Sequence, residues 1–315
     1  MHWEILNNMK LYFAPLEGIT TYTFRNVHHE MFGGCDEYFA PFITPTDNEK
    51  LSVKNLRDVL PQNNTCPLRV QCLASSETAF VSFAEKMMSY GYDDVNLNLG
   101  CPSGTVVKKA RGSGALKDLA RLDEFLDYIF KNSKTKISIK TRTGFYSHDE
   151  FDALLKIYSK YPVSELIVHP RVREEYYRLP VNMESFSKAF DYNFNLCYNG
   201  DVNSSSDFRN IISEYPSVSS VMIGRGAVRN PAIFREISGG KPLETSELIS
   251  FSKELEKRYF AILNSDMYTL HKLKEIWLYA MDNYPLEKKI LKAVKKANKL
   301  SELNSAINCL PEILS

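Results

Sequence analysis

The sequence predicts an α/β fold, a (β/α)8 TIM barrel followed by a C-terminal all-helical domain. Eight short apolar runs lie between residues 10 and 223, and most of them are followed by a segment with helical periodicity. Strand and helix patterns that alternate about every thirty residues indicate parallel βαβ units, and eight such units make a (β/α)8 barrel. A doubly wound open sheet is the main alternative, but no G-x-G-x-x-G motif follows the first apolar run, which disfavours it.

The individual elements follow from the period of the apolar residues and from the residues that interrupt it. The predicted strands are residues 10–14, 38–42, 68–72, 94–99, 136–140, 165–169, 195–198 and 218–223. The clearest helical segments between them are residues 77–90, 119–131, 150–161 and 205–215.

A cluster of breaking residues marks the end of the predicted barrel. Residues 238–242 read Ser-Gly-Gly-Lys-Pro, which is typical of a boundary. Beyond them apolar residues recur at helical spacing, as at Leu270 and Leu273, without any strand pattern. We therefore expect a barrel domain at residues 1–237 and a helical domain at residues 238–315.

The composition is that of a globular protein without a strong overall charge. Of 315 residues, 44% are apolar and 24% are charged, and the formal net charge is +1, so contact with a polyanion requires a local basic patch. The six cysteines are scattered without a C-x-x-C pair, which argues against a metal site or disulfide framework and fits a reducing compartment. Neither a membrane span nor a signal-peptide pattern is present in the sequence. We expect a soluble cytoplasmic protein, and nothing demands more than a monomer.

One cysteine stands at the predicted end of a buried strand. Residues 94–99 alternate polar and apolar positions, and Cys101 then lies between Gly100 and Pro102, both of which end a strand. In parallel α/β folds chemistry takes place at this end of the strands. Cys101 is a candidate nucleophile, metal ligand or proton donor, and a buried structural thiol is the alternative interpretation.

Polar side chains follow most of the other predicted strands as well. Strand by strand these ends are Ala14-Pro15-Leu16-Glu17-Gly18, Gln71, Asn98 with Cys101, Lys140-Thr141-Arg142, His169-Pro170-Arg171, Asn199-Gly200-Asp201 and Gly224-Arg225-Gly226. Singly, each is compatible with a turn or a satisfied core polar group. Together they predict one concave site at the mouth of the barrel.

Several of these residues favour FMN as the bound cofactor. Residues 199–201 and 224–226 follow the seventh and eighth strands, where barrels of this type bind phosphate, and glycine lets backbone N–H groups approach it. A lysine that points inward, as expected of Lys140, needs an anionic partner, and a reduced flavin provides one. Gln71 is placed to bond another polar edge of the ring, and the small residues 14–15 leave room for a flat ring.

These residues resemble those of the tRNA-dihydrouridine synthase family over essentially the whole chain. The matching segments are APLEG (14–18), NLNLGCPSGTVVKKARGSGAL (96–116), KTRTG (140–144), HPR (169–171), NGD (199–201) and GRGA (224–227). The resemblance implies NADPH-dependent reduction of the C5–C6 double bond of particular uridines in tRNA. It further implies that the flavin delivers hydride to C6 and that Cys101 donates a proton to C5, in keeping with a thiol pKa of about 8.5.

The same resemblance assigns the remaining site residues. Those implied to hold FMN are Pro15, Leu16, Glu17, Gln71, Lys140, His169, Asn199, Gly200, Asp201, Gly224 and Arg225. Asn98 and Arg142 are expected to face the uracil, and Tyr38 to form a stacking wall for the base. His169 is expected to touch flavin, uracil or both, with a backbone-bonded histidine at the barrel mouth as the alternative.

Two other functions are open on the sequence alone. One is an FMN barrel that acts on a free pyrimidine, similar to dihydroorotate dehydrogenase, and the other is a tRNA-binding protein with a silent barrel. A lysine-rich segment of the helical domain favours a tRNA substrate, although a solvated helix face is its ordinary explanation. Its members are Lys288, Lys289, Lys292, Lys295, Lys296 and Lys299, opposed only by Glu287.

Overall fold

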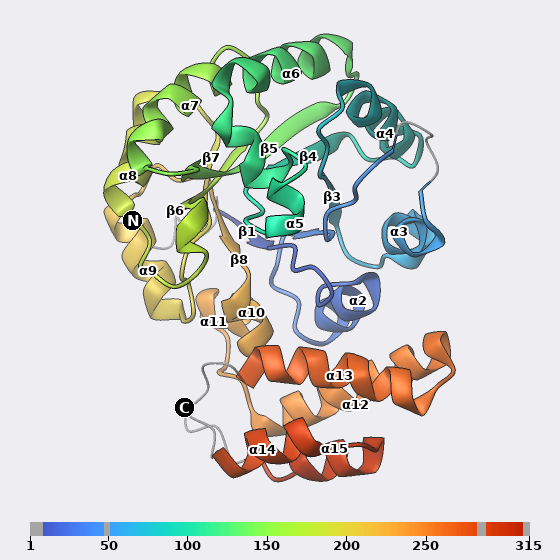
Figure 1. Ribbon diagram of the computed structural model, residues 1–315. Coiled ribbons are helices and arrows are strands. Elements are labelled where there is room, and N and C mark those ends of the chain that lie inside the picture. The colour runs from blue at the N-terminus through green and yellow to red at the C-terminus, as the bar shows by residue number, and fades with distance from the viewer. Residues whose placement is uncertain (1–8, 47–50, 282–287, 311–315) are drawn as a thin grey trace.

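The computed structural model describes residues 9–46, 51–281 and 288–310. Within them, eight parallel strands close into a barrel in the order β1 to β8 (Figure 1). The strands are β1 Lys10–Phe13, β2 Glu37–Phe39, β3 Leu68–Cys72, β4 Asp94–Leu99, β5 Lys136–Gly144, β6 Leu166–Val172, β7 Leu196–Tyr198 and β8 Ser220–Ile223. The predicted (β/α)8 barrel is therefore confirmed, and the open sheet is excluded because β1 pairs with both β2 and β8.

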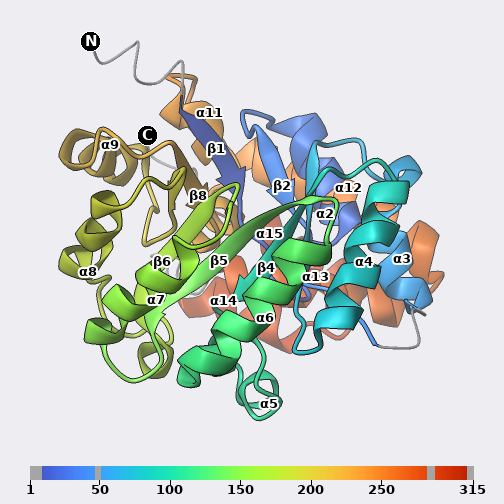
Figure 2. The same ribbon diagram turned by 90° about the horizontal axis from the view of Figure 1, so that it is seen from above.

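Helices surround the barrel and connect its strands (Figure 2). They are α2 Tyr22–Met31, α3 Val53–Val59, α4 Glu77–Ser89, α5 Gly104–Val107, α6 Leu119–Asn132, α7 Phe151–Tyr158, α8 Met183–Ser187, α9 Ser205–Glu214, α10 Arg225–Arg229 and α11 Ile233–Ile237. Side-chain caps explain several of their starts. Ser76, Asp118 and Ser204 each accept a hydrogen bond from a backbone N–H in the first turn of α4, α6 and α9.

The period of two along each strand decides which side chains enter the barrel. On β4 the apolar residues Val95, Leu97 and Leu99 belong to the core between the barrel and its helices. The intervening residues Asp94, Asn96 and Asn98 point inward and bond across the barrel interior to neighbouring strands. The alternation visible in the sequence therefore builds a polar column inside the barrel.

The amino-terminal end of the barrel is closed by a buried ion pair. Glu165 accepts from Arg69 at 2.7 Å, from the Tyr12 hydroxyl at 3.0 Å and from Ser220 at 2.8 Å. Arg69 also pairs with Glu37 at 2.6 Å. Because every charge here has partners, we interpret these residues as structural. We therefore look for the active site at the opposite end of the barrel.

Helices α12 to α15 form a separate bundle next to α2 and α10 (Figure 1). They are α12 Thr245–Leu263, α13 Asp266–Met281, α14 Lys288–Lys296 and α15 Leu300–Ile307. The hydroxyl groups of Thr21 and Tyr259 lie 2.8 Å apart between α2 and α12, and Lys272 of α13 donates to the carbonyl of Gly18 in the loop after β1. The C-terminal helices are thus confirmed, while the division at residue 237 stays a prediction.

No helix within the described ranges combines the length and apolarity that crossing a bilayer requires.

Candidate active site

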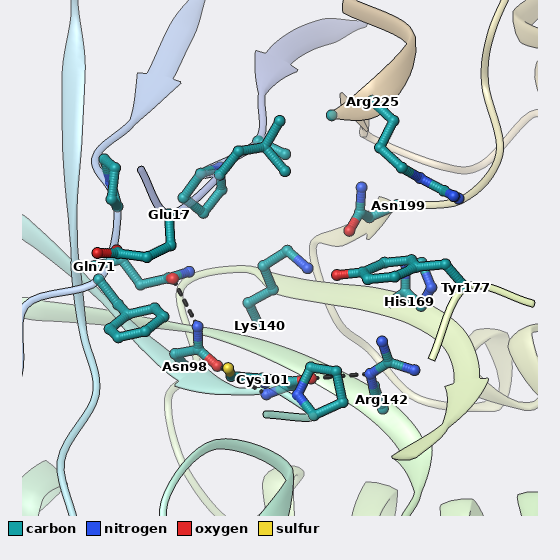
Figure 3. Close-up of a pocket in the computed structure, with 18 of the residues that line it drawn as sticks. Glu17, Gln71, Asn98, Cys101, Lys140, Arg142, His169, Tyr177, Asn199 and Arg225 are labelled. Atoms are coloured by element: carbon teal, nitrogen blue, oxygen red, sulfur yellow. Dashed lines mark hydrogen bonds between the residues drawn. The ribbon is translucent and has the colours of Figure 1, made fainter. Parts of the chain in front are cut away.

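A pocket opens at the carboxyl ends of the barrel strands (Figure 3). All of the site residues predicted from the sequence line it except Asp201 and Tyr38. The structure also places residues there that sequence reasoning missed, which are Pro41, Phe42, Gly100, Pro102 and Tyr177.

The turn that carries Cys101 is held from several sides. The Asn98 carboxamide oxygen accepts from the backbone N–H of Gly100 at 3.0 Å and of Cys101 at 2.9 Å. The Cys101 carbonyl accepts from both the backbone N–H and the hydroxyl of Ser113. Gly112 lies against this turn with φ 56°, where an added Cβ would come within 2.8 Å of the Cys101 carbonyl oxygen. This close approach explains the glycine in the G-S-G segment after α5.

The thiol of Cys101 stays protonated at neutral pH. Its partial burial raises its pKa above the ordinary value, although the cationic groups of Arg142 and Lys140 act in the opposite direction. Cys35, Cys66, Cys72 and Cys197 are buried and Cys309 is exposed, away from the pocket. Among the described residues, Cys101 is therefore the cysteine placed to exchange a proton with a molecule in the pocket.

Lys140 supplies an enclosed positive charge to the same pocket. No carboxylate of the described residues lies within salt-bridge distance of its amino group. Burial, and after it the nearby Arg142, lower the pKa of Lys140 from 10.5 to about 8. An anion in the pocket would restore the charged form, so this side chain favours a ligand with negative charge.

An ion-pair network surrounds His169. The buried Arg171 donates to His169 Nε2 at 3.0 Å, to the Leu179 carbonyl at 2.7 Å and to both carboxylate oxygens of Asp201. Asp201 in turn accepts from Arg225 at 2.6 Å. Asp201 therefore orients two arginines, and it lines an adjoining pocket that shares Tyr177 and Arg225 with this one.

The arginine contact also determines the protonation of His169. A guanidinium can only donate, so Nε2 of His169 is an acceptor and the proton of the neutral ring lies on Nδ1. Burial and the surrounding cations, chiefly Arg142, Lys140 and Arg171, lower the pKa of His169 well below its usual value. His169 thus lines the pocket as a neutral ring. Its Nε2 accepts from a side chain, Arg171, and not from the backbone as the alternative interpretation proposed.

Arg142 is placed at the pocket but is committed largely to the backbone. Its guanidinium donates to the carbonyls of Gly100 at 2.9 Å, Val172 at 2.9 Å and Tyr176 at 3.0 Å. It therefore joins the Cys101 turn to the loop after β6. Tyr177 of that loop lies over both Arg142 and Arg225, with guanidinium-to-ring distances of 5.4 Å and 4.6 Å.

The structure corrects the expectation for Tyr38. This side chain is completely buried and its hydroxyl bonds to His28 Nδ1 at 2.7 Å, between β2 and α2. The next residue, Phe39, belongs to the apolar cluster inside the barrel. Because side chains alternate along a strand, Tyr38 faces the helices and cannot stack on a base in the pocket. The aromatic side chains that line the pocket are Phe42, which follows β2, and the half-exposed Tyr177 from the loop after β6.

We expect replacement of Lys140 by methionine to stabilise the flavin-free protein at pH 7, by up to about 3 kcal/mol. Between pH 8 and 10.5 the folded state binds fewer protons at Lys140 than the unfolded state, so the destabilisation caused by burying the charge fades as pH rises. The difference in unfolding free energy between Lys140→Met and wild type, measured by urea unfolding, should thus shrink from pH 7 to pH 10. The exposed Lys136 of the same strand provides the control, since Lys136→Met should show no such trend. A gap that stays constant with pH would contradict the assignment.

Comparison with known proteins agrees with this geometry. The family model described as dihydrouridine synthase matches residues 12–310. The chain is 26% identical over 230 residues to tRNA-dihydrouridine synthase B of Pseudomonas aeruginosa, covering 72% of this chain and 68% of that protein. It is 27% identical over 291 residues to the tRNA-dihydrouridine(16) synthase of Neisseria meningitidis, covering 86% and 85% respectively. The chain therefore belongs to the dihydrouridine synthase family.

Proposed function

We propose that this tRNA-dihydrouridine synthase reduces its uridines in the pocket at the barrel mouth, with FMN as cofactor, NADPH as electron source and Cys101 as the acid. The observation that carries the proposal is the protonated Cys101 thiol on one side of a pocket whose floor presents the unpaired Lys140. The protonated thiol is suited to proton transfer to carbon, and the lysine is suited to an electron-rich ring.

The donor set of the pocket suits FMN. Lys140 offers a cation without a protein counter-ion, while Gln71 and neutral His169 offer N–H groups to the ring. Near the phosphate, Arg225 adds charge, and Gly224 keeps the wall low, since a Cβ there would meet Ala14 at 3.2 Å. Gly226 packs against Val202, whose carbonyl oxygen would lie 2.1 Å from an added Cβ. These residues would hold the flavin across the pocket with its phosphate near β7 and β8.

The acid role of Cys101 follows from the charge that the reaction develops. A bound, reduced FMN would supply the hydride for C6 of the uracil. The electron pair displaced from the double bond would then take the proton of the Cys101 thiol at C5, which breaks the S–H bond and leaves its electrons on the sulfur as a thiolate. Because burial keeps that thiol protonated, the proton is available at neutral pH. Asn98 holds the turn that aims it.

The direct test is dihydrouridine formation by the purified protein. NADPH and a full set of unmodified tRNAs are supplied, and the product is measured by nucleoside mass spectrometry. We expect product from tRNA and none from free uridine or free orotate. Reduction of a free pyrimidine instead of tRNA, by the flavin-loaded protein, would overturn the proposal in favour of a small-molecule enzyme.

The tRNA contact is proposed to include the exposed lysines of α14. Lys288, Lys289, Lys292, Lys295 and Lys296 are all exposed there, while Ile290 and Val294 are buried against the bundle. Glu287, the acidic residue expected to oppose them, lies outside the described residues. A helix with one apolar face buried and a lysine face exposed is suited to follow a phosphate backbone.

Reversing three of these charges should weaken tRNA binding. In the triple variant Lys292→Glu, Lys295→Glu, Lys296→Glu, we expect the affinity for tRNA to fall at least about tenfold at moderate salt. The salt dependence of tRNA binding should also become shallower, because fewer counterions are released. Filter binding at several salt concentrations measures both quantities. The matched control reverses the exposed Lys131, Lys134 and Lys156 around α6 and α7, far from α14 in Figure 1. Equal losses in the two triple variants would indicate overall charge and not a patch.

A further inference from the structure

A continuous chain of side-chain hydrogen bonds runs from the Cys101 turn down through the barrel interior. Asn98 Nδ2 donates to Gln71 Oε1 at 2.7 Å (Figure 3), and Gln71 Nε2 donates to Asn96 Oδ1 at 2.8 Å. Asn96 Nδ2 donates to the Ser138 hydroxyl at 3.0 Å, which donates to Asp94 Oδ1 at 2.7 Å. The chain thus crosses β4, β3 and β5 and ends at the opposite end of β4.

Each end of this chain has only one possible polarity. At the top, the backbone N–H groups of Gly100 and Cys101 can only donate, so they fix the oxygen of Asn98 toward the turn. At the bottom, the carboxylate of Asp94 accepts from Ser138 and, through its second oxygen, from Ser164 at 2.6 Å. The two ends agree, so the direction of every bond between them is determined and no amide orientation is left ambiguous.

The interior members have few alternatives if the chain is cut. Gln71, Asn96 and Ser138 have no accessible surface, so water cannot readily replace a lost partner. Gln71 and Asn98 also line the pocket. Asn98, which keeps some accessible surface, uses one amide N–H within the hydrogen-bond chain and keeps a second one. A donor at this place matches a carbonyl oxygen of an isoalloxazine or a uracil ring.

We propose that Ser138 and Asp94 are positioning residues for the reduction, acting through Asn96 and Gln71 on Asn98 and the Cys101 turn. The proposal rests on the proposed function of Cys101 as the acid. Ser138 and Asp94 touch neither cofactor nor substrate. They fix the amide of Gln71 with its oxygen toward Asn98, and through it they hold Asn98 on the turn that positions the thiol.

The test compares Ser138→Ala with Ser164→Ala. Both variants remove one hydroxyl that donates to the same Asp94 carboxylate, but only Ser138 belongs to the chain that reaches Cys101. The first readout is alkylation of Cys101 by iodoacetamide in the flavin-loaded protein, in a Cys309→Ser background because Cys309 is exposed. The second readout is single-turnover dihydrouridine formation on tRNA.

We expect Ser138→Ala to speed Cys101 alkylation by at least about threefold, because a loosened turn exposes the thiol, and to slow single-turnover product formation about tenfold. The tRNA concentration at half saturation should not change. Ser164→Ala should behave as wild type in both assays, and Ser138→Thr, which keeps the hydroxyl, should restore most of the rate. If Ser138→Ala does not retain flavin, Asp94→Asn is used in its place.

Equal alkylation and turnover in the two serine variants would overturn the positioning role. The outcome is separable from the proposed function, since alkylation reports on the turn whether or not the thiol is the acid. Full product formation by Cys101→Ala would reject the acid assignment, while the comparison of the serine variants would still decide whether the chain positions the turn.

Discussion

Replacing Cys101 by alanine should reduce dihydrouridine formation by about 10²- to 10⁴-fold, the usual contribution of a positioned acid. Hydride transfer to C6 leaves negative charge at C5, and without the thiol the proton must come from water. The flavin content and its reduction by NADPH should be retained, because neither requires Cys101. A single turnover with pre-reduced enzyme and unmodified tRNA isolates the affected step.

Two further variants serve as controls for Cys101→Ala. Cys309→Ala, which removes an exposed thiol outside the pocket, should keep full activity. Cys101→Ser should remain strongly impaired, since a hydroxyl is a much weaker acid than a thiol at the same place. Because burial raises the pKa of Cys101, the wild-type rate should not decline through loss of this proton until the pH exceeds the ordinary range of a thiol. An early decline near neutral pH would count against the assignment.

Replacing Asp201 by asparagine should destabilise the protein by about 2 to 3 kcal/mol. Asp201 is the carboxylate partner of Arg171, whose side chain is 2% exposed, and it also pairs with the partly exposed Arg225. Removing the negative charge leaves the buried guanidinium with neutral acceptors only, which are the Leu179 carbonyl, His169 and the single amide oxygen that remains at position 201. Flavin affinity should fall as well, because Arg225 is no longer oriented. Urea unfolding of the flavin-free protein measures the first effect, and fluorescence titration with FMN measures the second.

The control for that variant is Asp123→Asn. Asp123 pairs with Lys160, whose side chain is 53% exposed, so the loss should stay below about 1 kcal/mol. Flavin binding should not change. A loss at Asp201 no larger than at Asp123 would show that the buried ion pair contributes little and that the network around His169 does not depend on it.

Much of the fold was predictable because the apolar period reports local geometry directly. Residues 68–72 and 94–99 were predicted as strands, and the structure has β3 Leu68–Cys72 and β4 Asp94–Leu99. β5 runs on to Gly144 instead of ending at Lys140, since the polar Thr141 and Arg142 find partners inside the protein. Short elements such as α5 and α8 carry too few residues for a helical period to be visible.

Site residues were predictable where they stand at the end of a strand. They were not predictable where the side of the strand on which a residue lies, or the shape of a loop, determines whether it reaches the pocket. The prediction for Tyr38 failed because one step along β2 moves a side chain from the barrel interior to the helices. Tyr177 was missed because it lies in an irregular loop, where Tyr176 adopts φ 51° and no period signals its position. The pairing of Asp201 with Arg171 and Arg225 could not be predicted, because these residues become neighbours only when β6, β7 and β8 are assembled.

The directed chain from Asp94 to Cys101 has a consequence for how such sequences diverge. Each of its bonds joins one donor to one buried acceptor, so a single replacement at Gln71, Asn96 or Ser138 leaves a buried group without that partner. A pair of replacements that changes both the donor and the acceptor of one bond leaves no buried group unpaired. We therefore expect these three positions, on three different strands, to change together in evolution, and to do so more tightly than their distance along the chain suggests.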